Sequence, residues 1–377
     1  MDARLYTIEG RSRGVDVEPA QLAHFTLNGG EAVSSQMIVD DLCWMPYCLD
    51  AENRRVIFVD VPTEVDLSDA VFAHLTQFHH ARRVLSIPYE SLAALSAQVS
   101  QPQNLIFIFN LARAGTTLVH RMLNQVDGVW CLSETDIYTD ISALERSEPG
   151  DEEILYLIRH CTPLSFRPRH PKQTLALKFR SQALLMADLF HRAYPQGKCI
   201  FLYRDALSWG NSFYKFVQRL DGTALFADHE TVKNLWSGLA LQADVSRLEA
   251  FIGRPVEQVG IQEFFPGMYA IHIEKYIETF RQGVPYYAIR YNELDSDREA
   301  VTAKLLEHCD LPPEALPQVM RAFDSDAQEG TQVARDRPAK SFTAEQSTRF
   351  LEVLGRHPQY NSSDILLPDI YHPDRVV

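Results

Sequence analysis

The sequence predicts an α/β fold in which a mostly parallel central sheet is flanked by helices. From residue 104 onward, short apolar runs typical of strands alternate with helical patterns, and the first run enters a helix through a loop with one glycine. Alternation of this kind produces a parallel sheet that helices cover on both faces. The chain has 377 residues, more than one core usually holds. We therefore expect an N-terminal extension or small α+β subdomain over residues 1–98 and the main α/β domain over 99–377.

The elements of the main domain follow from their apolar patterns. An unbroken apolar run predicts a buried strand, and apolar residues at helical spacing predict the buried stripe of a helix. The expected strands are 105–109, 174–179, 198–204 and 284–294. The expected helices are one that begins at Thr116 and three over 182–194, 208–220 and 297–310.

The first 98 residues carry fewer signals. Gly29–Gly30 predicts a turn, and a strand, a helix and a second strand are expected at 54–62, 66–84 and 84–87. The histidines of this block do not share one helix face, so packed or solvated side chains are favoured over a metal site; they are His74, His79 and His80. The role of this block is left open: it covers a ligand cleft, pairs with the main sheet or mediates oligomerisation.

Composition narrows the class of partner. The net charge of −14 argues against a nucleic-acid-binding surface, so any anion site must be a local pocket. The N-terminus lacks the apolar core of a signal peptide, and no segment approaches the length of a membrane span. The six cysteines lack disulfide or zinc spacing. These features predict a cytoplasmic protein.

The loop after the first strand predicts an anion site. The first amides of a helix have no acceptor within it, and the helix dipole adds partial positive charge there. Gly115 permits close backbone approach, Arg113 offers a guanidinium, and Thr116 and Thr117 offer hydroxyls. This set suits a phosphate or sulfate. The first glycine and the lysine of a Walker A loop are absent. The alternative is a capped helix start with a surface arginine.

A second anion site is indicated one strand–helix unit later. The strand 198–204 ends at Arg204, and Ser212 lies eight residues beyond, on the following helix. An arginine at a strand end and a hydroxyl on the next helix can converge on another phosphate. The alternatives are a surface contact between Arg204 and Asp205 and a serine that the helix merely tolerates. Two such sites suggest a ligand with two separated anionic groups.

These segments resemble a known family. "LARAGTTL" followed by "IFLYRDALSWGNSFYKF" is similar to sulfotransferases that use 3′-phosphoadenosine 5′-phosphosulfate (PAPS), whose first motif reads roughly PRSGTT and whose second is a strand ending in R-D-P. "IRYNEL" (289–294) resembles the family's YEDL strand end. The resemblance covers about residues 100–345. It implies a P-loop-like three-layer sandwich, PAPS as donor and 3′,5′-ADP (PAP) as product.

The resemblance also implies which residues bind the nucleotide. Arg204 and Ser212 hold the 3′-phosphate, and a basic C-terminal loop corresponds to 329–340, with Arg335 as first choice there. Arg337 and Lys340 are its rivals, because the family's R-G-x-x-G spacing is not reproduced. The residues implied for the 5′-phosphosulfate are Arg113, Ala114, Gly115, Thr116 and Thr117.

The chain departs from the family at three motif positions. Ala112 and Ala206 replace prolines and lose only backbone stiffness. Ala114 replaces a serine and lacks its hydroxyl donor. One hydrogen bond typically contributes about 1 kcal/mol, so this loss would weaken the binding of the nucleotide.

The catalytic residues are implied by the same comparison. Lys178 aligns with the family lysine that precedes a catalytic histidine, but here Arg180 occupies the histidine position and cannot serve as a base. Another branch uses a glutamate after the first helix, which Glu134 supplies. We expect Glu134 as the base and Lys178 as the group that stabilises the leaving oxygen, with Asp136 and His170 in reserve. Glu134 could instead cap a helix that starts near Ser133.

The sequence therefore predicts in-line sulfuryl transfer from PAPS to a hydroxyl or amine of a small-molecule acceptor, with no metal. Two other classes stay open. One is a catalytically silent relative that binds a nucleotide or a partner. The other is a nucleotide-dependent phosphotransferase, which the missing Walker lysine disfavours. The oligomeric state is left open.

Overall fold

The computed structural model describes residues 2–14, 16, 18–146, 151–166, 173–220, 229–325 and 338–368. The chain folds into two compact units. The first unit comprises Met1–Phe107 with Leu123–Gly197, and the second comprises Ile108–Met122 with Lys198–Val377. The predicted boundary at residue 98 falls inside the first unit, and the division into domains at that point stays a prediction.

The expected parallel sheet is present. Its five strands have the order β10-β9-β6-β8-β7. Within the second unit β10 pairs parallel with β9, and within the first unit β7 pairs parallel with β8. The strands consist almost entirely of buried residues because both faces are covered. Their bounds are β6 Asn104–Asn110, β7 Val129–Ser133, β8 Thr174–Lys178, β9 Lys198–Tyr203 and β10 Tyr286–Arg290. The α/β fold class is confirmed.

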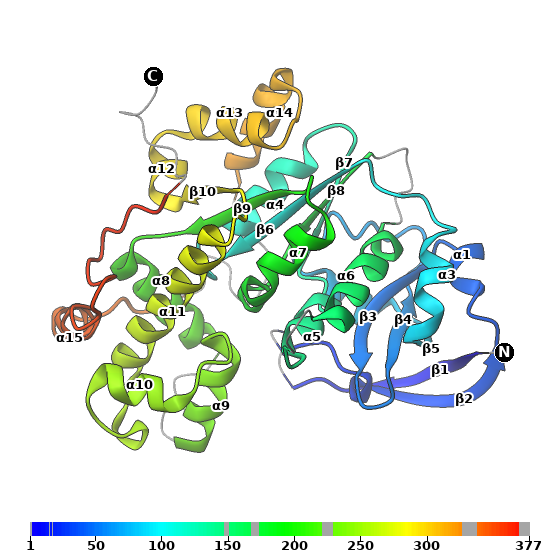
Figure 1. The fold of residues 1–377 in the computed structure, drawn as a ribbon, viewed down its shortest axis with the longest axis horizontal. Helices are drawn as coiled ribbons and strands as arrows, with labels where there is room; N and C mark the ends of the chain where they lie inside the picture. The colour runs from blue at the N-terminus through cyan, green and yellow to red at the C-terminus, as the bar shows by residue number, and fades with distance from the viewer. Residues whose placement is uncertain are drawn as a thin grey trace. The chain divides into compact units, whose positions relative to one another are not determined.

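The N-terminal extension forms a second sheet, antiparallel, in the first unit (Figure 1, blue). Its order is β2-β1-β5-β4-β3. The strands are β1 Ala3–Arg11, β2 Phe25–Val33, β3 Trp44–Asp50, β4 Arg55–Asp60 and β5 Arg83–Pro88. The expected strands at 54–62 and 84–87 are confirmed as β4 and β5.

The turn expected at Gly29–Gly30 is wrong. Both glycines lie inside β2, with φ of 100° and 101°. The pairing of β1 with β2 slips by one residue here, because Leu5 pairs with Glu31 and Tyr6 with Gly29. This is a β-bulge, in which glycine supplies the positive φ without a steric penalty. A bulge and a turn share this residue preference, so the glycine pair alone does not distinguish them.

The helices of the first unit are mostly short. The predicted helix at 66–84 is confined to α2, and the one at 182–194 begins as a 3-10 helix. The helix α6 packs against β3 and α3, and α5 packs against β3. The bounds are α1 Met37–Asp40, α2 Ala73–His80, α3 Leu92–Ser96, α5 Ile137–Ala143, α6 Glu152–Ser165 and α7 Ala187–Ala193, with 3-10 segments at Leu22–His24, Tyr89–Ser91 and Ser181–Met186.

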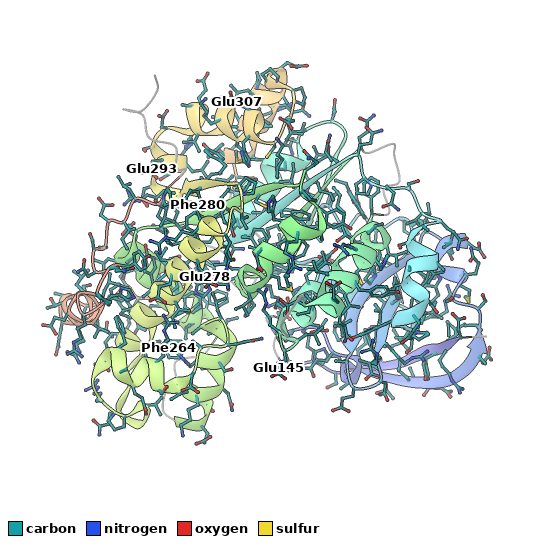
Figure 2. The ribbon with its side chains drawn as sticks, viewed as in Figure 1. Glu145, Phe264, Glu278, Phe280, Glu293 and Glu307 are labelled. Carbon is teal, nitrogen blue, oxygen red and sulfur yellow. The ribbon has the colours of Figure 1, made fainter. Side chains whose placement is uncertain are left out.

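The second unit surrounds its part of the sheet with longer helices. The helix α11 packs against α8, α9, α10 and α15, and its Phe264 (Figure 2) meets the Trp236 ring edge-on at 5.4 Å between centroids. The bounds are α8 Ala206–Arg219, α9 His229–Leu239, α10 Val245–Ile252, α11 Ile261–Arg281, α12 Tyr291–Ser296, α13 Arg298–His308, α14 Leu316–Met320 and α15 Ala344–Leu354, with 3-10 segments at Val256–Gln258, Pro313–Ala315 and Arg321–Phe323. The helix α4, Thr116–Asn124, begins in this unit.

One further correction concerns the end of the sheet. The strand expected over 284–294 stops at Arg290, and Tyr291 begins α12.

None of the helices in the described part of the chain is long and apolar enough to cross a lipid bilayer.

Asp140 of α5 links the helix to the N-terminal sheet. Its Oδ2 accepts a hydrogen bond of 2.7 Å from the Leu49 amide. Burial raises the pKa of Asp140 to about 7, and the charge of Asp136 adds to the rise, while the Leu49 amide and Arg180 oppose it. A carboxyl with a raised folded-state pKa contributes stability that is fully present below the unfolded pKa, and that contribution is lost as the pH rises to about 7.

Asp140→Asn is therefore expected to stabilise the protein more at pH 8 than at pH 4.5, because asparagine keeps the acceptor for Leu49 without acquiring charge. The gap between pKa values of about 4 and about 7 corresponds to about 4 kcal/mol of unfolding free energy. Since the Asp140 side chain is partly exposed, solvent screens this effect, and we expect the gain in unfolding free energy to be about 1–2 kcal/mol larger at pH 8 than at pH 4.5. Urea unfolding at both pH values measures the effect. A wild-type-to-variant difference that does not change with pH would contradict it.

Candidate active site

The loop between β6 and α4 is held in a tight, left-handed path in the second unit. The Leu111 amide donates to Leu202 O at 2.9 Å, and Trp209 Nε1 donates to Ala112 O at 2.7 Å. Arg113 and Gly115 then take φ values of 65° and 87°. Backbone in which φ alternates between negative and positive values turns successive amides toward one side, and these amides form a concave anion site.

The helix α4 begins where this loop ends. The amides of Leu118 and Val119 are the first to bond into it, at 3.0 and 3.2 Å from Gly115 O. The amides of Thr116 and Thr117 come before these and correspond to the unpaired first turn of a helix. Both threonine residues are buried. Ala114 is fully buried and contributes only backbone groups to an anion.

Tyr291 joins this loop to Arg204. A Cβ atom added at Gly115 would lie 2.5 Å from Tyr291 Cδ2, so the ring occupies the space that any other residue would need. The guanidinium carbon of Arg204 lies 4.8 Å from the centroid of the same ring. The structure thus brings the Arg204 guanidinium and the glycine loop onto one aromatic ring.

Arg204 has no charged partner in the described part of the chain. Its Nε is buried, and no acceptor among the described residues bonds it. Its backbone carbonyl accepts a 3.0 Å hydrogen bond from the Tyr269 hydroxyl, and the next residue, Asp205, caps α8 by accepting 2.9 Å from the Ser208 amide. The contact between Arg204 and Asp205 that the sequence left open is not formed. A half-buried cation without a counter-ion among the described residues favours an anionic ligand.

The helix α8 carries Ser212 and, one turn later, Phe216, both half-buried. Residues four apart lie on the same helix face. The Arg113 guanidinium carbon lies 5.4 Å from the Phe216 ring centroid. Arg113 and Ser212 therefore share one region of the second unit, while Trp209, fully buried, packs into its core.

Glu134 and Lys178 form an ion pair in the first unit. They directly follow and end the neighbouring strands β7 and β8, and the Lys178 ammonium donates to Glu134 Oε1. Lys178 is 2% exposed and Glu134 16%. The Lys178 Nζ also lies 5.9 Å from the Phe72 ring centroid. The alternative role of Glu134 as a helix cap is not supported, because α5 begins only at Ile137.

The charge state of Glu134 follows from this pairing. Burial alone would raise the pKa of Glu134. The charges of Lys178 and Arg180 and the hydrogen bond from Lys178 outweigh burial and leave that pKa below its ordinary value. Glu134 is therefore ionised at neutral pH and able to accept a proton.

Both carboxylate oxygens of Asp136 accept hydrogen bonds. Arg180 donates to both of its oxygens, at 2.6 and 3.0 Å, and the Ala20 amide donates to Oδ2 at 2.8 Å. Asp136 is fully buried, whereas the Glu134 carboxylate retains access to solvent. These contacts favour a structural role for Asp136 over its reserve role as base.

Three predicted residues fall outside the described part of the chain: His170, Arg335 and Arg337. Lys340 is described, and both its backbone groups bond the Gln218 side chain. Tyr291 and Phe216 were not predicted as site residues, although each stacks with a predicted arginine. A tyrosine at the end of "AIRY" and an aromatic one turn beyond Ser212 were the available signals.

A family model described as the sulfotransferase domain matches residues 103–352. The chain belongs to this sulfotransferase family. No curated protein matched the chain. Membership of the family supports sulfotransferase activity in general terms.

Three similar solved structures share little sequence identity with the chain. The sulfotransferase from Alicyclobacillus acidocaldarius is 16% identical over 68% of this chain and 94% of its own, with a TM-score of 0.41. Mouse sulfotransferase SULT7A1, solved with PAP, is 14% identical over 71% and 88%, with a TM-score of 0.36. Retinol dehydratase, solved with androsterone and inactive cofactor PAP, is 13% identical over 75% and 88%, with a TM-score of 0.37.

Proposed function

We propose that this sulfotransferase uses PAPS as donor and sulfates a hydroxyl or amine of a small-molecule acceptor. The observation that carries the proposal is the arrangement of Arg204, Tyr291 and Gly115 in the second unit. Arg204 is half-buried, its buried Nε has no acceptor among the described residues, and its guanidinium lies against the Tyr291 ring that also fills the space beside Gly115. Such an arrangement fits a nucleotide with two anionic groups better than a single phosphate.

The residues present fit this donor. Arg204 and Ser212 would hold the 3′-phosphate, and Arg113 with the backbone from Ala114 to Thr117 would hold the 5′-phosphosulfate. Gly115 is needed because a side chain there would strike Tyr291. PAPS supplies an activated sulfuryl group whose bond to the 5′-phosphate oxygen is the one that breaks.

In the proposed reaction Glu134 and Lys178 supply the proton chemistry. Glu134 takes the proton of the acceptor hydroxyl or amine as the new bond to sulfur forms. Lys178 donates a hydrogen bond to the leaving phosphate oxygen, on which negative charge develops. At rest the two groups neutralise each other. Withdrawal of Lys178 toward the leaving oxygen would raise the basicity of Glu134 when it is needed.

The acceptor class follows from charge. A chain with net charge −14 repels polyanions, which favours a small acceptor over a nucleic acid or a highly sulfated polysaccharide. We also propose a cytoplasmic location, from the sequence alone.

Thermal unfolding in the presence of ligands tests the donor assignment. We expect 3′,5′-ADP, and not ATP with magnesium, to raise the melting temperature. A ligand at about 100 times its Kd adds about 2.7 kcal/mol of stability. Radiolabelled PAPS with a panel of phenols, alcohols and amines then tests transfer. Stabilisation by 3′,5′-ADP without transfer to any acceptor would support the silent relative. Stabilisation by ATP with magnesium alone would support a phosphotransferase.

A further inference from the structure

Glu134 has a rare backbone conformation, and both its amide and its carbonyl form hydrogen bonds. Its φ is 54°, in the left-handed region that residues with a side chain rarely adopt. Its amide donates to Lys178 O at 2.7 Å, and its carbonyl lies 3.1 Å from His74 Nδ1. His74 is on α2, in the N-terminal extension and the same compact unit. Conformations of this kind persist where their surroundings enforce them.

The contacts of His74 favour the tautomer with the proton on Nδ1. Glu134 O can only accept, so Nδ1 carries the proton and donates to it. Arg180 Nη2 can only donate and lies 3.0 Å from Nε2, so Nε2 accepts. Burial and the Arg180 charge, opposed by Asp136, lower the pKa of His74 and keep the ring neutral. Asp16 O lies 3.2 Å from the same Nε2 and would bond only a protonated nitrogen, but the Arg180 donor at 3.0 Å is the nearer of the two.

Arg180 is itself fixed by the N-terminal extension. It forms two hydrogen bonds to Asp136, whose Oδ2 also accepts from the Ala20 amide. His74 is 1% exposed and Asp136 0%. The chain of contacts therefore runs from Ala20 through Asp136 and Arg180 to His74, and ends on the Glu134 carbonyl.

We propose that His74 is a positioning residue for Glu134, so that the N-terminal extension completes the proton-accepting site. The inference rests on the proposed function for its catalytic meaning, whereas the structural link between His74 and Glu134 is independent of it. The Nδ1 donor acts on Glu134 directly, whereas Nε2 acts through Arg180, whose Nε lies 3.9 Å from Glu134 Oε2. The two ring nitrogens can therefore be tested separately.

Two substitutions separate them. In His74→Asn the amide nitrogen lies near the position of Nδ1 and can still donate to Glu134 O. In His74→Gln the amide group reaches the position of Nε2 and can still accept from Arg180, but the donor to Glu134 is lost. We expect His74→Gln to lower kcat by about 10²-fold and His74→Asn by about threefold, because small displacements of a reacting group are costly. The KM for PAPS should change little in either variant.

His80→Gln is the matched control, because His80 is exposed on the same helix. A residue that only stabilises the fold would give equal losses in the two His74 variants, in proportion to their melting temperatures, and this would overturn the proposal.

Amide hydrogen exchange of residues 133–136 supplies a readout that needs no turnover. Exchange there should rise in His74→Gln and stay near wild type in His74→Asn and His80→Gln. If His74→Gln leaves it unchanged, the positioning role is contradicted even if the wild type transfers sulfuryl groups. If the wild type transfers none but exchange responds as expected, the proposed function fails and the link between His74 and Glu134 stands.

Discussion

Glu134→Gln is expected to lower kcat by about 10²- to 10⁴-fold, since glutamine keeps the shape of glutamate and cannot accept the proton of the acceptor. The affinity for 3′,5′-ADP should stay within about threefold, because the residues proposed to bind the nucleotide are others. Steady-state kinetics with PAPS and calorimetric titration of 3′,5′-ADP measure the two effects. Turnover near the wild-type rate would remove Glu134 as the base.

The same substitution also affects stability, and a second variant separates the two effects. Glu134→Gln leaves the Lys178 ammonium, 2% exposed, without its charged partner, which typically costs about 3 kcal/mol. Replacing Lys178 by methionine as well removes the uncompensated charge. The double variant should regain most of the lost unfolding free energy, which would identify the unpaired charge as the cause of that loss, and it should remain inactive because it lacks both proposed catalytic groups. Recovery of activity together with stability would show that the single variant failed through misfolding.

Gly115→Ala is expected to lower the affinity for 3′,5′-ADP by about 10²-fold. The new methyl group would lie 2.5 Å from Tyr291 Cδ2, and alanine at a φ of 87° is strained even without that contact. Strain of this kind costs about 1–3 kcal/mol, and each 1.4 kcal/mol is a factor of ten in affinity. Either the loop or the Tyr291 ring must move, and Arg204 lies on that ring.

Gly283→Ala is the matched control in the same unit. Its φ is 95°, but no atom lies within 4 Å of the added methyl group. Both variants should lose some stability through backbone strain, and only Gly115→Ala should lose the nucleotide. Calorimetric titration with a melting curve for each variant makes the comparison. Equal nucleotide affinity in the two variants would contradict the assignment of the Gly115 loop.

The parts of the site that could be predicted from the sequence are those that depend on residues adjacent in the chain or on a family motif. A buried strand that enters a helix through "ARAGTT" must present backbone amides and Gly115 at the strand end. Lys178 and Glu134 were assigned from the family resemblance, and the structure places them at the ends of the neighbouring strands β8 and β7. Their ion pair follows from this adjacency.

The parts that were missed depend on contacts distant in sequence. Tyr291 falls within the predicted strand, and its stacking on Arg204 and closeness to Gly115 depend on where β10 ends. His74 lies in a block without a recognised motif, yet it bonds the Glu134 carbonyl. Periodicity cannot reveal such a contact, because sixty residues of chain separate the partners. Positive φ at Glu134 likewise has no sequence signature in a non-glycine residue.

The central claim is that Arg204 recognises the 3′-phosphate of an adenine nucleotide whose 5′ end is held by the Gly115 loop. Calorimetric titration with 3′,5′-ADP and with 5′-AMP, which differ only in that phosphate, tests it most directly. The wild type and the exposed-arginine control Arg281→Gln should prefer 3′,5′-ADP by about 10- to 100-fold, as expected for charge-assisted hydrogen bonds. Arg204→Gln should bind both nucleotides about equally, with its 5′-AMP affinity near wild type. An Arg204→Gln variant that weakens both nucleotides by the same factor, or a wild type without preference, would contradict the claim.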